Sequence, residues 1–351
     1  MTQVDDMIIG AETSAFLSQV EEALKAALAD AAGDQPRGDM LMTAARHLCI
    51  GGGGKRIRPL LVHYFGRALG VSDERMVEAG AAAELIHSAS LLHDDVVDHG
   101  MFRRGRPTVN SLWGNVVAVM TGDVVLTVAL QRLAAVDQTL VADALACVAD
   151  MTRGTIAELE GRGDLDMPLE RMRFIADAKT GALFGWCGLA AATLAGDAEA
   201  RPRLGQFGRR LGVAFQIADD VRDLTAGDKG KPAFADLASK TPSLPLLLAA
   251  RKDPAVRKRI QDAWGFGAMT QERLRELGAA VLGTGALAEA VQRIKEEISA
   301  ALELFQPFAD TPGGAELVGW AHQLAAAFED RGGHEGHPVE RRVVAPEHHA
   351  V

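Results

Sequence analysis

Two groups of aspartates are the residues of this 351-residue sequence that point most directly to chemistry. Both have the spacing D-D-x-x-D, and they comprise Asp94, Asp95, Asp98, Asp219, Asp220 and Asp223. Successive residues of a helix are about 100° apart, so the carboxylates of each group would share one helical face. Crowded carboxylates repel one another unless a cation lies among them, and their oxygens suit Mg²⁺. The spacing therefore predicts Mg²⁺ sites.

A single D-D-x-x-D is weak support for a metal, because the solvated acidic end of a helix explains one copy equally well. This chain has two copies, each preceded by an apolar helical stretch and followed by basic residues. The repetition favours the metal hypothesis over the solvated face.

Basic residues accompany both aspartate groups. Mg²⁺ keeps several of its waters and binds through one or two carboxylates together with substrate phosphates. Arginine and lysine then neutralise the remaining phosphate oxygens, so this combination suits a diphosphate. The basic residues concerned are Lys55, Arg56, Arg58, Arg103, Arg104, Lys179, Lys229, Lys231 and Lys240.

These residues need helices to position them, and the composition favours an all-α fold. Hydrophobic residues make up 48% of the chain and aromatic residues 5%, which leaves little material for strands. A long helix is predicted from Ser72, its N-cap, to a stop at Gly100, and another from Pro202 to just before Gly227. Each would carry one aspartate group at its C-terminal end.

Charge and cysteine content exclude several classes of protein. The net charge of −10 argues against a nucleic-acid binder. The three cysteines are widely spaced, which indicates a reducing cytoplasm without disulfides or zinc. The N-terminus lacks the basic region of a signal peptide, and the most apolar stretch, 116–136, contains Asp123 and Arg132. We expect a cytoplasmic protein without a transmembrane segment.

The chain is expected to form a single all-α domain over residues 1–331, because no break in composition divides it. Residues 332–351 are polar and hold four of the ten histidines. We predict a disordered tail there rather than a metal site.

The motifs together resemble a known family. Over about residues 40–330 the chain resembles the trans-isoprenyl diphosphate synthases, all-α enzymes that elongate prenyl chains. The matching motifs, in family order, are "GGGKRIRP", "ELIHSASLLHDDVVDHGMFRRGRPT", "GN…TGD", "KTGALF", "FQIADDVRD" and "GKPAFADLASK". The resemblance implies one large helical bundle of the isoprenoid synthase type with a central active-site cavity.

The resemblance also implies roles for individual residues. Three Mg²⁺ ions would be held by Asp94, Asp98 and Asp219, with the other three aspartates in support. The residues implied to lie at the allylic diphosphate are Arg103, Lys179, Thr180, Gln216, Lys231 and Lys240. Those implied to bind the diphosphate of isopentenyl diphosphate are Lys55, Arg58, His87 and Arg104.

The implied reaction proceeds by ionisation, condensation and elimination. Metal ions and basic side chains stabilise the diphosphate as it leaves. The isopentenyl double bond attacks the allylic cation, and the departed diphosphate accepts the proton that is then lost. No side-chain general base is required.

The chain departs from the family pattern at a few positions. Where the family often has Gly-Glu-x-x-Gln, this chain has Thr155 and Glu158 in place of Glu and Gln, and the glycine common before Lys240 is absent. The departures leave open a terpene cyclase or diphosphate lyase on the same fold. A non-catalytic regulatory subunit of a heteromeric prenyl synthase is the non-enzyme alternative, although such a subunit would have lost an aspartate motif and both are intact.

The helix before the first aspartates is the expected wall of a product tunnel. Ala89 and Ser90 lie about one turn before Asp94, where a bulky aromatic gives short products in the family. Both are small here, and "LLHDDVVD" most resembles the long-chain branch that makes quinone side chains. We therefore expect octaprenyl to decaprenyl products. We also expect a homodimer, and peripheral membrane contact for product release. A farnesyl or geranylgeranyl diphosphate synthase is the shorter-chain alternative.

Overall fold

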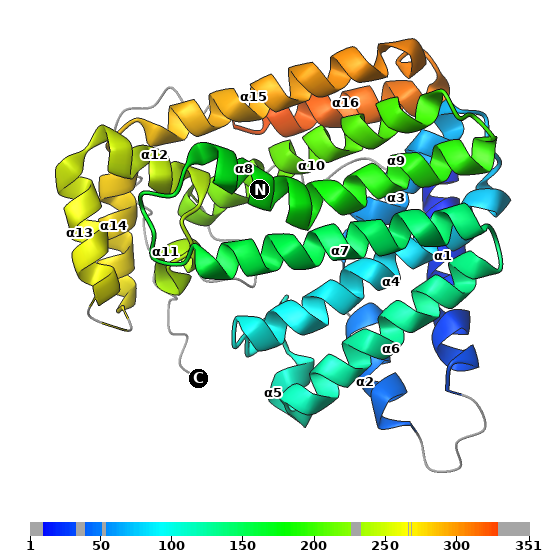
Figure 1. Cartoon of the computed structure of the whole chain (residues 1–351), viewed down its shortest axis with the longest axis horizontal. Helices are drawn as coiled ribbons and strands as arrows, with labels where there is room; N and C mark the ends of the chain where they lie inside the picture. Colours follow the sequence, from blue (N-terminus) through cyan, green and yellow to red (C-terminus); the bar gives the residue numbers. More distant parts are fainter. Residues whose placement is uncertain are drawn as a thin grey trace, which may run out of the picture.

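Helices account for nearly all of the structure (Figure 1). The computed structural model describes residues 10–32, 39–50, 54–225, 233–265, 267 and 269–328. The all-α prediction is confirmed. In chain order the helical segments, including π-helical η1 and 3-10 helical η2, are α1 (Ala11–Asp30), α2 (Met40–Cys49), α3 (Ile57–Ala68), α4 (Asp73–Val97), α5 (Val109–Trp113), α6 (Asn115–Ala134), α7 (Gln138–Glu160), α8 (Leu169–Ala176), η1 (Asp177–Gly181), α9 (Ala182–Ala195), α10 (Ala200–Thr225), α11 (Ala235–Ser239), α12 (Leu244–Lys252), α13 (Pro254–Gly265), α14 (Gln271–Leu282), α15 (Ala286–Phe305), η2 (Gln306–Phe308) and α16 (Pro312–Ala326).

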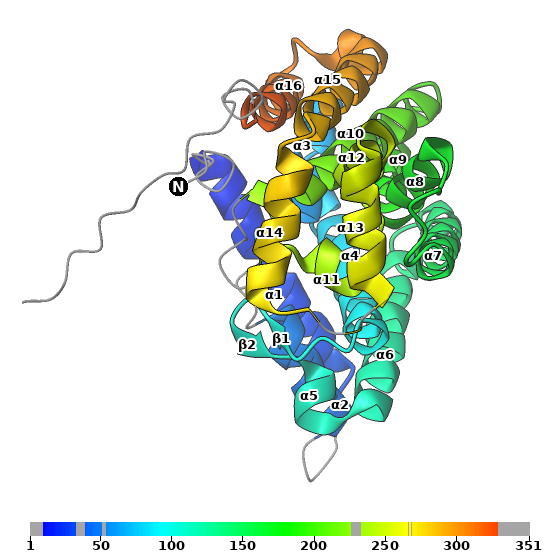
Figure 2. The same ribbon diagram turned by 90° about the vertical axis from the view of Figure 1, so that its left-hand side faces the viewer.

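Helices α4 and α10 carry the two aspartate groups through the assembly. α4 packs against α3 and α6, and α10 packs against α9 and α15. Most of the long helices run side by side, whereas α13 and α14 lie across one end of them (Figures 1 and 2). The aspartate-bearing ends of α4 and α10 both lie toward this end, on the left in Figure 1.

A small hairpin follows the first aspartate group, formed by β1 (Phe102–Arg103) and β2 (Arg106–Pro107). The two residues between the strands, Arg104 and Gly105, both have positive φ, 51° and 75°. Positive φ at both positions is the geometry of a tight two-residue hairpin turn. The turn fixes the places from which Arg103 and Arg104 leave the backbone.

The end of α4 differs from the sequence prediction. The helix was expected to stop at Gly100, but Asp98 is already its C-cap residue. His99 takes the positive φ of 53°, and the Gly100 amide donates to the Asp95 carbonyl at 2.9 Å, which is a Schellman arrangement. Asp98 therefore belongs to the helix cap and not to the helical face assumed from the spacing.

The start of α10 also differs, because the helix begins at Ala200, two residues before the expected Pro202. The Asp197 carboxylate accepts hydrogen bonds from the amides of Glu199 and Ala200, at 3.1 and 2.9 Å, and caps the helix. Pro202 lies within the first turn, where a missing amide costs no helical hydrogen bond. The helix does reach the second aspartate group, as predicted.

The end of η1 and the start of α9 approach α10 along facing glycines. A Cβ added at Gly212 of α10 would lie only 2.6 Å from the Cα of Gly181. No side chain fits at that distance, so the two backbones are in direct contact. This contact brings Thr180 of η1 against Gln216 of α10, one turn before the second aspartate group.

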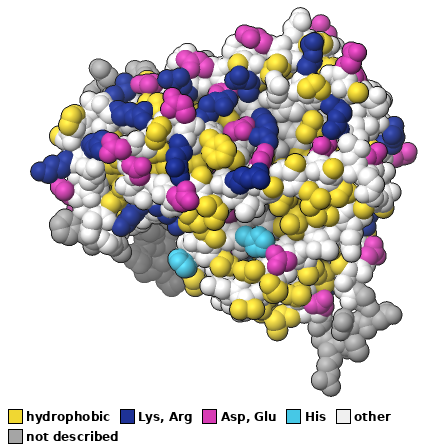
Figure 3. Space-filling model, in the orientation of Figure 1, with side chains coloured by type: hydrophobic (Ala, Val, Ile, Leu, Met, Phe, Trp, Pro, Cys, Tyr) yellow, Lys and Arg dark blue, Asp and Glu magenta, His cyan; other side chains and the backbone are white. Residues whose placement is uncertain are grey.

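Among the described residues one helix, α6, is long and apolar enough by length and composition to cross a membrane, with a mean hydropathy of 1.6. Of its most apolar window, 39% is buried within the helical assembly. Its exposed side chains include Val116 and Met120. Hydrophobic side chains gather on the face shown in Figure 3, over the lower region that α6 occupies in Figure 1.

Candidate active site

Two carboxylates of the first aspartate group are paired with arginines. Asp95 is buried and accepts hydrogen bonds from Arg103 of the hairpin, at 3.1 Å from Nε and 2.8 Å from Nη2. Asp98 is paired with Arg162, which lies two residues after α7. The first group is thus tied both to the hairpin and to the loop after α7.

The third carboxylate, Asp94, lies beside Lys179 of η1 at one end of a cavity. Burial raises the pKa of Asp94, and Asp98 and Glu158 raise it further, while Lys179 opposes them. The Lys179 ammonium is paired with the Glu158 carboxylate. Burial alone would lower the pKa of Lys179, but Glu158 and Asp94 outweigh burial and raise it. The ammonium is therefore held in its charged form next to Asp94.

A chain of hydrogen bonds leads from η1 to the second aspartate group. Thr180 Oγ1 donates to Gln216 Oε1 at 2.8 Å, and Gln216 Nε2 donates to Asp220 Oδ1 at 3.1 Å. The amide of Leu244 donates to the other Asp220 oxygen at 3.4 Å. Burial, with a contribution from Asp219, raises the pKa of Asp220 to about 7. The Asp220 carboxylate is therefore surrounded by uncharged hydrogen-bond donors, and its ionisation costs free energy.

The remaining members of the second group differ in exposure and role. Asp223 accepts hydrogen bonds from the amides of Ala235 and Asp236, at 2.8 and 3.1 Å, and so caps α11. Asp219 is 42% exposed and is paired with Arg222 at 3.5 Å. Burial, with Asp220 and Asp223, holds the pKa of Asp236 well above its usual range.

Cations predicted to bind the second diphosphate gather beside the first aspartate group. Burial, followed by the nearby charges of Arg58 and Arg104, lowers the pKa of His87 well below its usual value. Arg58 lies over the Phe184 ring at 5.5 Å, and its buried Nε has no hydrogen-bond partner among the residues that the structure describes. Lys55, three residues before Arg58, is exposed. Arginines close to a neutral histidine form a cluster of donors suited to an anion.

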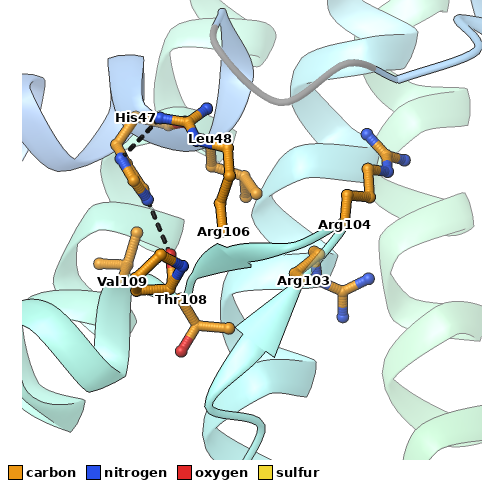
Figure 4. Close-up of a pocket in the computed structure, with 8 residues that line it drawn as sticks. His47, Leu48, Arg103, Arg104, Arg106, Thr108 and Val109 are labelled. Carbon is orange, nitrogen blue, oxygen red and sulfur yellow. Dashed lines mark hydrogen bonds between the residues drawn. The ribbon is translucent and has the colours of Figure 1, made fainter. Parts of the chain in front are cut away.

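Arg103 and Arg104 leave the hairpin in different directions (Figure 4). His47 of α2 anchors the hairpin from the other side, 2.8 Å from the Pro107 carbonyl and 3.0 Å from Arg106 Nη2. The crevice between these residues has a volume of about 10 Å³, room for roughly one water molecule. It is an anchoring contact and too small for a diphosphate.

Lys240 is placed differently from the other predicted cations. Its φ is 61°, and its carbonyl accepts a hydrogen bond from the Gly163 amide at 2.8 Å, which joins the loops after α7 and α11. Its ammonium donates to the carbonyl of Trp264. Within the described part of the chain, no hydrogen bond or ion pair joins Lys240 to the aspartate groups. Lys231 and the predicted tail, 332–351, lie outside the described residues.

A cavity of about 270 Å³ begins at Asp94 and Lys179 and extends between α4, α6 and α7. Ala89 and Ser90 lie on its α4 wall. Ser90 Oγ donates to the His87 carbonyl at 2.8 Å, so this hydroxyl is satisfied within its own helix. The other lining residues are Ile86, His93, Val97, Leu126, Val148, Met151, Thr152, Thr155, Ile156 and Leu159.

The α7 wall of the cavity contains one of the departures from the family pattern. Thr155 lines the cavity, and its hydroxyl donates to the Met151 carbonyl at 3.1 Å. Ile156, the next residue, is 51% exposed and also lines the cavity. The cavity is therefore charged at one end, largely apolar along its walls, and open to the surface beside α7.

Three residues beside the aspartates were not among the predicted site residues: Arg162, Glu158 and Asp236. Arg162 is a lone arginine in "EGRGD" and gave no signal in the sequence. Glu158 was noted only as a departure from the family pattern. Asp236 lies within a matching motif, "GKPAFADLASK", so that motif was a signal for it.

The donor set fits Mg²⁺ better when a phosphate contributes ligands. Within the described ranges, no group of three or more His, Cys, Asp or Glu side chains is arranged to hold a metal by itself. Mg²⁺ is commonly bound by one or two carboxylates together with substrate phosphates and water. The half-buried Asp94 and the buried Asp220 have raised pKa values and would be stabilised as anions by added positive charge.

Comparison with known proteins agrees with this arrangement. The family model for polyprenyl synthetase matches residues 39–281. The chain belongs to the polyprenyl synthetase family and is a prenyltransferase.

Relatives in this family include long-chain synthases. Octaprenyl diphosphate synthase of Haemophilus influenzae is 36% identical over 281 residues, which cover 78% of this chain and 84% of that protein. All-trans-nonaprenyl-diphosphate synthase (geranyl-diphosphate specific) of Rhodobacter capsulatus is 34% identical over 272 residues, 76% of this chain and 83% of that protein.

Solved structures share the fold over nearly the whole chain. Polyprenyl synthase from Caulobacter crescentus, complexed with calcium and isoprenyl diphosphate, has a TM-score of 0.81 at 28% identity, covering 92% of this chain and 99% of that one. A decaprenyl diphosphate synthase from Rhodobacter capsulatus has a TM-score of 0.80 at 26% identity, covering 90% and 98%.

Proposed function

We propose that this chain is a long-chain trans-polyprenyl diphosphate synthase, which adds isopentenyl diphosphate units to an allylic diphosphate. The observation that carries the proposal is the cavity that begins at Asp94 and Lys179 and continues between apolar walls. A charged end suits a diphosphate, and an apolar passage suits the hydrocarbon attached to it. The octaprenyl and nonaprenyl relatives support the long-chain assignment.

The aspartates would hold the metal. We assign Mg²⁺, three ions in all, to Asp94, Asp98 and Asp219, with Asp95, Asp220 and Asp223 in support. When bound, Mg²⁺ supplies positive charge that stabilises the departing diphosphate. The calcium and isoprenyl diphosphate in the Caulobacter structure support a site of this kind.

The basic side chains would divide between two diphosphates. Lys179 lies beside Asp94 and is assigned to the allylic diphosphate, together with Arg103, the adjacent Thr180 and its hydrogen-bond partner Gln216 on α10. Lys231 and Lys240 complete this assignment. Lys55, Arg58, His87 and Arg104 are assigned to isopentenyl diphosphate, because Arg58 and Arg104 lie close enough to His87 to lower its pKa.

The apolar walls would protect the reaction. An allylic cation reacts with any accessible nucleophile, and most of the cavity wall beside Asp94 consists of methyl and methylene groups and of hydroxyls satisfied within their own helices. Of the two nucleophilic side chains in the wall, His93 and Met151, the His93 Nε2 lies 3.3 Å from the Val119 carbonyl. Excluding water in this way leaves the isopentenyl double bond as the available nucleophile. The diphosphate that departs accepts the proton released at the end of each cycle.

The proposal extends to location and assembly. Exposed apolar side chains on α6 and α7, among them Val116, Met120 and Leu145, support a homodimer that covers them. The cavity opens beside Ile156, which supports product release at a membrane surface. We assign the enzyme to the cytoplasm, with products used as quinone side chains.

Incubation with labelled isopentenyl diphosphate and farnesyl diphosphate, followed by mass spectrometry of the products, tests the proposal. Elongated diphosphates of octaprenyl to decaprenyl length are expected. Products that stop at farnesyl or geranylgeranyl length would indicate the shorter-chain alternative. A cyclic hydrocarbon would indicate a cyclase or lyase, and absence of turnover without a second subunit would indicate the regulatory role.

A further inference from the structure

Glu158 places a carboxylate from α7 against Lys179, which lines the cavity beside Asp94. It lies in the last turn of α7, and its Oε2 is paired with Nζ of Lys179. The two side chains are 21% and 22% exposed, so the pair is largely removed from solvent. The cation that lies beside Asp94 is therefore already shared with another anion.

The charge of Glu158 reaches both aspartate groups. After burial, it is among the causes that raise the pKa of Asp94 on α4 and of Asp220 on α10. Glu158, paired with Lys179, therefore adds a negative charge that both aspartate groups experience. Glutamine at this position would offer similar shape and hydrogen bonds without the charge.

We propose that Glu158 is a positioning residue that holds Lys179 when no substrate is present and makes diphosphate binding depend on Mg²⁺. A diphosphate that arrives without metal meets two aspartate groups, the Glu158 carboxylate and a lysine that is already paired. Mg²⁺ brings the positive charge that offsets this repulsion. The inference rests on the proposed function only in naming the anion as an allylic diphosphate.

Neutral substitutions of Glu158 distinguish an effect of its charge from an effect of its packing. Glu158→Gln keeps the length and a hydrogen-bond acceptor for Lys179, whereas Glu158→Asn is shorter and places its amide farther from the lysine. If the charge of Glu158 is what matters, both variants remove the ion pair to Lys179 and the repulsion between the Glu158 carboxylate and the diphosphate. If packing is what matters, Glu158→Gln resembles the wild type and Glu158→Asn binds less well.

Calorimetric titration with inorganic diphosphate at low salt, with and without Mg²⁺, measures the effect directly. Without Mg²⁺, both neutral variants should bind diphosphate roughly three- to tenfold more tightly than the wild type, because one nearby negative charge is gone. With saturating Mg²⁺ the difference should shrink. The matched control is Glu160→Gln on the same helix, whose carboxylate is 62% exposed and paired with Arg171, and it should match the wild type.

Steady-state kinetics provide a second readout. At limiting Mg²⁺, Glu158→Gln should lower the KM for the allylic diphosphate and leave the KM for isopentenyl diphosphate unchanged. Unchanged or weaker diphosphate binding by both neutral variants would overturn the inference. A different result would contradict the proposed function: a wild-type protein that binds inorganic diphosphate but incorporates no isopentenyl diphosphate.

Discussion

The two aspartate groups have the same sequence spacing but are held in opposite ways. In the first group, Asp95 and Asp98 are paired with arginines, and Asp94 lies beside Lys179. In the second group, Asp220 is held by a glutamine and a backbone amide, and Asp223 by two backbone amides. Every carboxylate of the first group has a cation beside it, whereas in the second group Asp219 is paired with Arg222 and the buried Asp220 is held by neutral donors.

This difference decides which group depends more on added positive charge. A carboxylate paired with arginine is stabilised as an anion before any metal arrives. A buried carboxylate with neutral donors keeps a raised pKa, and Asp236 adds a further acid to the second group. The second group is therefore expected to be more sensitive to pH and to the supply of Mg²⁺.

The largest expected effect tests whether both groups serve the reaction despite their different surroundings. Asp94→Asn and Asp219→Asn should each lower turnover by at least about a thousandfold, because each removes an assigned metal ligand. Melting temperatures should stay near that of the wild type, since removing a charge relieves repulsion. Near-normal turnover of either variant at saturating Mg²⁺ would remove that group from the mechanism.

The next prediction distinguishes the cation assigned to the allylic diphosphate from those assigned to isopentenyl diphosphate. Lys179→Ala should raise the KM for the allylic diphosphate by roughly ten- to a hundredfold, whereas Arg104→Ala and Lys55→Ala should mainly raise the KM for isopentenyl diphosphate. Initial rates measured with each substrate varied in turn provide the test. Equal effects on both substrates would show that the cations are not divided between two diphosphates.

A substitution on α4 before the first aspartate group should change product length with little loss of rate. No such effect on length is expected from the second group. Ala89→Phe places a ring in the cavity wall, so products should shorten to farnesyl or geranylgeranyl length. Leu282→Phe, at an exposed position of α14, is the control and should leave length unchanged. Long products from Ala89→Phe would show that the chain grows along another wall.

The smallest effect concerns the stability of the metal-free protein. Asp220 has a pKa of about 7 in the fold against an ordinary value of 3.8, so between these values the folded state holds a proton that the unfolded state has released. Stability should then fall as pH rises through this range. Between pH 5 and 8 in EDTA, the wild type should lose roughly a few degrees more of melting temperature than Asp220→Asn. Parallel curves for the two proteins would contradict the raised pKa.

The sequence predicted the helices and the aspartates well, because both depend on local patterns. Apolar periodicity placed α4 and α10 to within a few residues, and the repeated D-D-x-x-D marked the ends of both. Cap geometry was harder, since His99 takes a left-handed conformation that glycine was expected to adopt.

Partners across the fold could not be read from the sequence. Arg162 meets Asp98 only because α7 returns beside α4, and its neighbours in the chain carry no motif. The pair of Glu158 and Lys179 depends on the packing of α7 against η1. Such contacts arise from tertiary packing, which a single sequence does not encode in any fixed spacing.

The π-helical segment η1 rotates α9 relative to α8 and so changes which side chains each helix presents to its neighbours. A π turn takes in one residue more than an α turn, so α9 is rotated by about 100° relative to a continuous helix from α8. With that rotation, Lys179 reaches the cavity while Gly181 still meets Gly212 of α10. Deleting one residue within η1 would restore a regular helix, in which only one of these two alignments is retained.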